Sequence, residues 1–184
     1  EISSPLKPFY YLANKAIENQ NGGIQIQIDS EIPLGVGLGS SSACCVAGAA
    51  AIFKLFQHIS KKEILELAIE AEKTIFKNTS GADCTVCTYG GMMAYDKKQG
   101  FKKIEDEPKF QLVIVNSNIK HSTDSMVSKV KAFKIKNKEE FSKLSDQESK
   151  LVEDVLKLLK ENNTKELGEK INQNQKYLET IGIS

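Results

Sequence analysis

Three glycines alternate with apolar residues and lead into three consecutive serines in the segment Pro33-Leu34-Gly35-Val36-Gly37-Leu38-Gly39-Ser40-Ser41-Ser42-Ala43. Glycine lets the backbone adopt positive φ angles and approach a ligand closely. An alanine-rich run typical of a helix follows, and a helix N-terminus offers unpaired N–H groups and a partial positive charge. The segment therefore indicates a phosphate site. The alternative is an ordinary glycine-rich turn before a buried helix.

The residues around this loop argue against two common phosphate-binding motifs. No Gly-Lys-Ser/Thr closes the segment, so it is not a Walker A loop. A dinucleotide-binding fingerprint needs a second strand with an acidic residue about 20 positions on, whereas residues 42–57 have the pattern of a helix. Ile24, Ile26 and Ile28 alternate with polar residues before the loop, which predicts a strand over 24–30.

Two carboxylates follow the loop. A helix is predicted from Lys61, because Ser60 and Glu63 form a capping box. On a helical wheel Glu72 is the only charged residue inside the broad apolar arc of that helix, and a buried carboxylate normally has a partner or a metal. Glu72 could instead lie at the rim and pair with a lysine. Asp83 follows in a Ser-Gly-Ala-Asp turn, where it could serve an Mg²⁺-ATP site or cap the next helix.

Composition limits the classes of partner. The 184 residues carry 25 Lys and Arg against 24 Asp and Glu, which gives no argument for nucleic acid. No apolar run approaches the roughly 18 residues of a membrane span. We therefore expect neither nucleic acid nor a membrane as a partner. The four cysteines include Cys84-x-x-Cys87 and the adjacent pair Cys44-Cys45. This spacing favours free thiols in a reducing compartment over a metal or redox site.

Periodicity and turn signals predict the other elements. They are a helix over 8–18, a strand over 92–95 that turns back toward 101–104, a buried strand over 112–115, and helices over 122–134, 146–161 and 165–180. The start of the helix over 146–161 is set by a second capping box, Ser145-Asp146-Gln147-Glu148.

The glycine-serine segment resembles the central ATP-binding motif of the GHMP kinases, which include galactokinases, homoserine kinases and mevalonate kinases. A second segment, Ser80-Gly81-Ala82-Asp83 followed by Thr88-Tyr89-Gly90-Gly91, is similar to the catalytic-aspartate segment of mevalonate kinases. The resemblance covers about residues 24–130. It implies an α+β fold with a left-handed β-α-β unit around the loop, against the usual right-handed rule. It also implies part of an N-terminal ATP-binding domain over 1–108 and part of a C-terminal helical substrate domain over 109–184.

The resemblance also implies roles for individual residues. The residues that would bind ATP are Gly35, Val36, Gly37, Leu38, Gly39, Ser40, Ser41 and Ser42. Ser41 and Glu72 occupy the positions that hold Mg²⁺, and Asp83 occupies the catalytic position that orients or deprotonates the substrate hydroxyl. The substrate-side positions are matched by Ile75, Ser80, Asp83 and Thr123. This sequence departs from the pattern at His121, where many mevalonate kinases have arginine.

The function implied by the resemblance is ATP-dependent phosphorylation of mevalonate to 5-phosphomevalonate by a cytoplasmic enzyme that could form a homodimer. One alternative is another GHMP kinase that acts on a different small alcohol. A second is a GHMP fold that binds a ligand without catalysis. Mevalonate kinases also carry an early lysine motif and a late glycine-rich motif that this sequence does not contain. We therefore expect an internal fragment of a longer enzyme, inactive alone, rather than a genuinely short protein.

Overall fold

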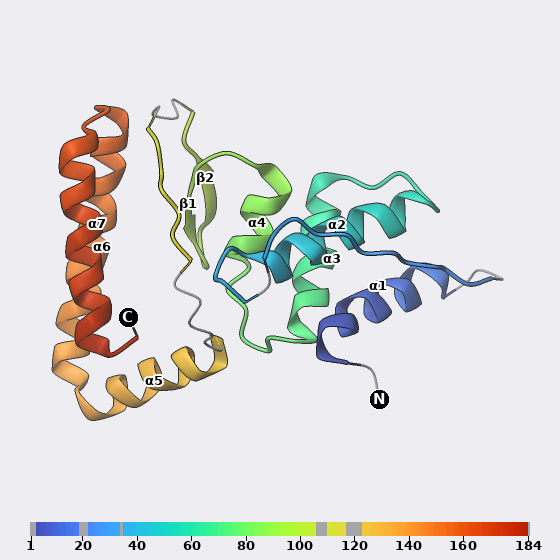
Figure 1. Ribbon diagram of the computed structural model, residues 1–184, viewed down its shortest axis with the longest axis horizontal. Helices are drawn as coiled ribbons and strands as arrows, with labels where there is room; N and C mark the ends of the chain where they lie inside the picture. The colour runs from blue at the N-terminus through green and yellow to red at the C-terminus, as the bar shows by residue number, and fades with distance from the viewer. Residues whose placement is uncertain (1–2, 19–21, 34, 106–109, 117–122, 184) are drawn as a thin grey trace. The chain divides into compact units, whose positions relative to one another are not determined.

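The computed structural model describes residues 3–18, 22–33, 35–105, 110–116 and 123–183. The chain divides into two compact units, Glu1–Lys103 and Ile104–Ser184. Helices dominate both units, and one antiparallel hairpin accompanies them in the described residues, so the fold is α+β as predicted (Figure 1). None of the helices in the described ranges is both long and apolar enough to cross a membrane.

The first unit places a hairpin after a run of helices. Its elements are η1 (Ser4–Leu6), α1 (Lys7–Ile17), α2 (Ser40–Lys54), α3 (Lys61–Lys73), α4 (Ala82–Tyr89), β1 (Met93–Asp96) and β2 (Gly100–Lys103). In the hairpin, Met93 pairs with Lys103 and Asp96 with Gly100. In Figure 1, α4 lies between the α2–α3 pair and this hairpin.

Small residues let α1, α2 and α3 pack closely. Ala49, Ala68 and Ala71 are fully buried in the core of the first unit. A close approach occurs at Gly48, where an added Cβ would lie 3.0 Å from Cε1 of Phe9. The aromatic ring from α1 therefore packs directly on the backbone of α2, and a side chain at position 48 would require the Phe9 ring to shift by a few tenths of an ångström.

The predicted capping box at the start of α3 is confirmed. The backbone N–H of Ser60 donates to the Glu63 carboxylate at 2.8 Å, and the backbone N–H of Glu63 donates to the Ser60 hydroxyl at 3.3 Å. The cap defines where α3 begins, and the helical repeat then places Glu72 among the inward-facing residues.

The second unit contains α5 (Thr123–Lys136), α6 (Lys138–Lys160) and α7 (Thr164–Ile181). Its buried leucines lie on α6 and α7, which pack against each other.

The predicted helix start at Ser145 is wrong, because α6 begins at Lys138 and continues through Ser145. Phe141 and Leu144 are half-buried on the same face as the buried Leu151. Packing of this continuous apolar face decides the helix start, and the local capping pattern does not.

The strands predicted over 24–30 and 112–115 are wrong. Both segments lack strand pairing, and apolar side chains in them are exposed, with Ile28 at 45% and Val113 at 88%. A strand needs a neighbouring strand to supply its hydrogen bonds, and the ladder found in the described residues is β1–β2 alone. Because no strand flanks α2 in the residues that the structure describes, the left-handed β-α-β unit stays a prediction.

Candidate functional site

The glycine-rich loop has a backbone conformation that suits glycine alone. Gly35, Gly37 and Gly39 have φ angles of 75°, 77° and 68°, in the left-handed region that is costly for other residues. The loop ends at Gly39, which is the N-cap residue of α2, and no side chain caps the helix there. The first backbone N–H groups of α2 are therefore left without a side-chain cap, as they are in anion sites at helix N-termini.

Asp83 lies next to the end of this loop, although the two are far apart in the sequence. A Cβ added to Gly39 would lie 3.8 Å from Oδ2 of Asp83. Asp83 is exposed in the first turn of α4, where the helix dipole favours a carboxylate. The N-cap residue of α4 is Gly81. The alternative role of Asp83 as the side-chain cap of this helix is therefore wrong.

Glu72 is buried, with 4% of its surface exposed. One carboxylate oxygen accepts a hydrogen bond from the Ser42 hydroxyl, and the other accepts one from the Thr79 hydroxyl. Burial raises the pKa of the Cys84 thiol of α4, and this thiol lies close enough to the carboxylate for the negative charge of Glu72 to raise that pKa further. Residues of α2, α3, α4 and the α3–α4 connection therefore meet at Glu72. Neither of the two salt bridges found in the described residues involves it, so the alternative of a lysine pair at the rim is wrong.

The four cysteines are free thiols. Burial raises the pKa of Cys45 to about 12, and the nearby Glu72 carboxylate adds to the rise. Burial also raises the pKa of Cys84, again with help from Glu72. A thiol must lose its proton to act as a nucleophile or a metal ligand. In the described ranges no three His, Cys, Asp or Glu side chains are grouped so that they could hold a metal ion.

The other predicted site residues are spread over both units. Ser41 is half-buried in the first turn of α2, and Ile75 is half-buried just after α3. Ser80 is exposed in the turn that precedes α4. Thr123 begins α5 in the second unit, so its part in the site stays a prediction. His121 lies outside the described residues.

Two residues that contact the Asp83 turn were not predicted. The Thr79 hydroxyl accepts a hydrogen bond from the backbone N–H of Gly81 at 3.2 Å, and the Tyr95 hydroxyl donates to the Ser80 carbonyl at 2.6 Å. A threonine two residues before a turn glycine is a recognisable local signal. Tyr95 comes from β1, and nothing in the local sequence indicates its contact.

Comparison with known families identifies the family to which these site residues belong. The profile described as "GHMP kinases N terminal domain" matches residues 7–91, which contain the glycine loop, Glu72 and Asp83. This part of the chain belongs to the GHMP kinase family.

Curated relatives of this GHMP kinase segment are named mevalonate kinase. One from Thermococcus sibiricus is 32% identical over 196 residues, covering 100% of this chain and 56% of the relative. One from Pyrococcus horikoshii is 35% identical over 170 residues, covering 88% and 50%. The chain thus spans about half the length of the curated relatives it matches. A crystal structure of L. major mevalonate kinase in complex with R-mevalonate shares the fold, with a TM-score of 0.73 at 24% identity, covering 97% of this chain and 56% of that one.

GHMP kinases use ATP, and the loop leaves room for a nucleotide, while a Mg²⁺ ion beside it stays a prediction. Cβ atoms added to Gly35 and Gly37 would meet no atom within 4 Å, so the protein leaves space beside the loop. Mg²⁺ takes oxygen ligands and is usually bound through one or two carboxylates plus phosphates. Each oxygen of Glu72 accepts one hydroxyl hydrogen bond, and a carboxylate has about four lone-pair sites. Glu72 therefore keeps capacity for a metal ion.

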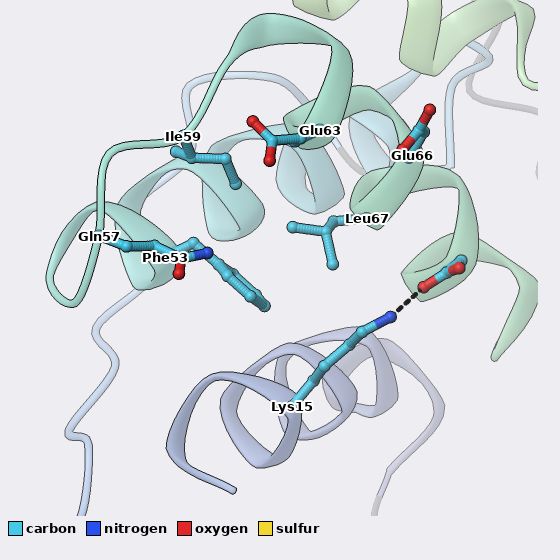
Figure 2. Close-up of a pocket in the computed structure, with 8 residues that line it drawn as sticks. Lys15, Phe53, Gln57, Ile59, Glu63, Glu66 and Leu67 are labelled. Carbon is cyan, nitrogen blue, oxygen red and sulfur yellow. Dashed lines mark hydrogen bonds and ion pairs between the residues drawn. The ribbon is translucent and has the colours of Figure 1, made fainter. Parts of the chain in front are cut away.

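A separate hollow of about 230 Å³ lies beside α1, α3 and the end of α2 (Figure 2). It is lined by Lys15, Phe53, Gln57, Ile59, Glu63, Glu66, Leu67 and Glu70, none of which was predicted as a site residue. Figure 2 shows Lys15 reaching from α1 toward α3, where its Nζ lies 2.6 Å from Glu70. Carboxylates outnumber cations in this lining, so the hollow does not suit a phosphate group.

Proposed function

We propose that this chain supplies the nucleotide-binding loop and the catalytic aspartate of an ATP-dependent kinase that phosphorylates mevalonate to 5-phosphomevalonate. One observation carries the proposal: the Asp83 carboxylate lies beside Gly39, the last residue of the glycine loop. A phosphate group held by the loop and by the first N–H groups of α2 would therefore lie near a carboxylate that can receive an alcohol.

The proposed reaction is an in-line transfer of the γ-phosphoryl group of ATP. The alcohol oxygen forms a bond to the γ-phosphorus while the bond to the bridging oxygen breaks and ADP leaves. Asp83 orients the alcohol and takes its proton, and the loop N–H groups stabilise charge on the phosphates. Magnesium, when bound by Ser41 and Glu72, would neutralise phosphate charge.

The choice of mevalonate is supported by relatives rather than by a contact in this chain. The curated relatives are named mevalonate kinase, and the structural neighbour was solved with R-mevalonate. Ile75, Ser80 and Thr123 would contribute to the substrate side. A different GHMP kinase substrate and a GHMP fold without catalysis are the competing functions, and the same assay separates them.

The decisive experiment is an ATP-dependent phosphorylation assay of the complete gene product with mevalonate, galactose and homoserine, each compared with the Asp83→Asn variant. Asparagine keeps the size of the side chain and one acceptor but cannot take a proton. If Asp83 orients or deprotonates the hydroxyl, kcat falls by about 10²-fold or more, the scale of general-base catalysis. The KM for ATP changes little, because the glycine loop binds the nucleotide.

Each outcome decides between the functions. Turnover of mevalonate that is lost in Asp83→Asn supports the proposal. Turnover of a different alcohol identifies another GHMP kinase, and ATP binding without turnover identifies a binding protein. An Asp83→Asn variant with near-normal kcat ends the catalytic assignment of Asp83.

A further inference from the structure

The turn that carries Asp83 into place is held from two sides by hydroxyl groups. On one side the Thr79 hydroxyl donates to the buried Glu72 carboxylate and accepts the backbone N–H of Gly81 at 3.2 Å. On the other side the Tyr95 hydroxyl donates to the Ser80 carbonyl at 2.6 Å. One hydroxyl comes from the α3–α4 connection and the other from β1, so the two contacts are independent of each other.

The packing around Gly81 leaves this turn little room to shift. Gly81 is buried and has a φ of 82°, in the region where only glycine is unstrained. A Cβ added there would lie 3.0 Å from Cδ1 of Ile69 and 3.4 Å from the Tyr95 hydroxyl. The Gly81 carbonyl accepts hydrogen bonds from both the backbone N–H of Thr85, at 2.9 Å, and the Thr85 hydroxyl, at 2.7 Å. The start of α4 is therefore fixed by packing and by hydrogen bonds at both polar groups of one residue.

We propose that Thr79 and Tyr95 are positioning residues that hold Asp83 at the end of the glycine loop. Thr79 connects the start of α4 to Glu72, which also binds Ser42 at the start of α2. Through this chain of hydrogen bonds the helix that bears Asp83 and the helix that begins at the loop share one anchor. The Tyr95 hydroxyl, which comes from β1 of the hairpin, holds the peptide group between Ser80 and Gly81. This inference rests on the proposed function of Asp83.

The inference predicts which kinetic constant changes. A catalytic group that is misplaced by about 1 Å can cost about 10²-fold in rate, and Asp83 contacts the alcohol rather than the nucleotide. Loss of either hydroxyl therefore lowers kcat, while the KM for ATP stays within about twofold. A residue that only stabilised the fold would lower the melting temperature without this selective loss of kcat.

The test compares Thr79→Val, Thr79→Ser and Tyr95→Phe with Thr88→Val in the complete gene product. Valine has the shape of threonine without the hydroxyl, and serine restores the hydroxyl. Thr88 is a matched control, because it is half-buried on α4 and its hydroxyl donates to the Cys84 carbonyl at 2.8 Å. We expect kcat to fall by about tenfold or more in Thr79→Val and Tyr95→Phe, and to stay within about twofold in Thr79→Ser and Thr88→Val.

A second comparison asks whether the effect passes through Asp83. In an Asp83→Asn background, Thr79→Val should lower kcat no further, because residues that act through one group are not additive. An equal loss in both backgrounds overturns the proposal, as does a Thr79→Ser variant as slow as Thr79→Val. Should Thr79→Val fail to fold, Tyr95→Phe together with Thr79→Ser decides the question by the same criteria.

Amide hydrogen exchange at Gly81 separates failure of this inference from failure of the proposed function. Exchange should be at least about tenfold faster in Thr79→Val than in the wild-type protein and unchanged in Thr79→Ser, since this N–H loses its partner only in the valine variant. If the protein phosphorylates no alcohol, the proposed function fails, and faster exchange still supports Thr79 as the residue that holds the turn. Unchanged exchange in Thr79→Val overturns the inference whether or not the protein is a kinase.

Discussion

Glu70 and Glu72 lie two positions apart on α3, yet the helix gives them opposite surroundings. Two residues correspond to a rotation of about 200°, so the two carboxylates project from nearly opposite faces. Glu70 is exposed and contacts Lys15 at 2.6 Å and the Tyr11 hydroxyl at 2.7 Å. Glu72 is buried and receives hydrogen bonds from the hydroxyls of Ser42 and Thr79.

The contrast separates two ways in which one helix accommodates an acidic side chain. At Glu70 water remains available, so the ion pair competes with solvation and contributes little to stability. At Glu72 water is excluded, so each carboxylate oxygen must find its partner within the protein. The exposed carboxylate can therefore be replaced with little effect, whereas the buried one connects three helices.

The largest effect on stability is expected when the buried carboxylate of Glu72 is removed. Glu72→Leu leaves the hydroxyls of Ser42 and Thr79 without their acceptor, and an unsatisfied buried donor costs about 1–3 kcal/mol. We expect the free energy of unfolding to fall by about 3 kcal/mol or more, measured by urea denaturation. The matched control, Glu70→Leu, should cost less than about 1 kcal/mol. Equal losses in the two variants would show that the different surroundings of the two carboxylates do not affect the free energy of unfolding.

A smaller effect is expected from Glu72→Gln, which keeps the shape of the side chain. The amide oxygen can still accept one hydroxyl, but the amide nitrogen then faces a second donor, at a cost of about 1–2 kcal/mol. Because a neutral amide is a poorer ligand for Mg²⁺ than a carboxylate, the magnesium concentration for half-maximal activity should rise. Glu70→Gln should leave that concentration unchanged. If the magnesium dependence of Glu72→Gln is that of the wild-type protein, the metal-ligand role of Glu72 is wrong.

Local sequence patterns predicted those parts of the fold that short-range contacts determine. The capping box of Ser60 and Glu63 is confirmed because its two residues lie within one turn of helix. Helical periodicity placed Glu72 within the apolar arc of α3 but left a position at its rim open, and the structure buries the side chain. The strand predicted over 112–115 is wrong because a strand depends on a partner that its own residues do not specify. The helix start predicted at Ser145 is wrong because packing of an apolar face that begins at Phe141 overrides the cap.

The candidate site was predictable where it rests on the loop motif and unpredictable where it rests on long-range contacts. The glycine spacing of the loop indicated positive φ angles, and Gly35, Gly37 and Gly39 have them. The partners of Glu72 could not be read from the sequence, because Ser42 lies on a different helix. The contact of Tyr95 with the Asp83 turn depends on how the hairpin packs, and no local pattern encodes that.

The smallest effect on the free energy of unfolding is expected from replacing the exposed carboxylate of Glu70. The dependence of this effect on pH and salt shows whether an exposed ion pair causes it. Hydrogen bonds from Lys15 and Tyr11 lower the pKa of Glu70 below its usual value. Its contribution to stability is therefore present above the unfolded pKa of about 4.3 and is lost as the pH falls through the folded pKa. Near neutral pH, Glu70→Gln should lower the free energy of unfolding by less than about 1 kcal/mol. At a pH below the folded pKa of Glu70, the stabilities of variant and wild type should converge. The difference should also shrink in about 1 M salt, because exposed charges are screened there. A loss of about 2 kcal/mol, or a loss that salt does not change, would show that Glu70 is held by burial, as Glu72 is, rather than by an exposed ion pair.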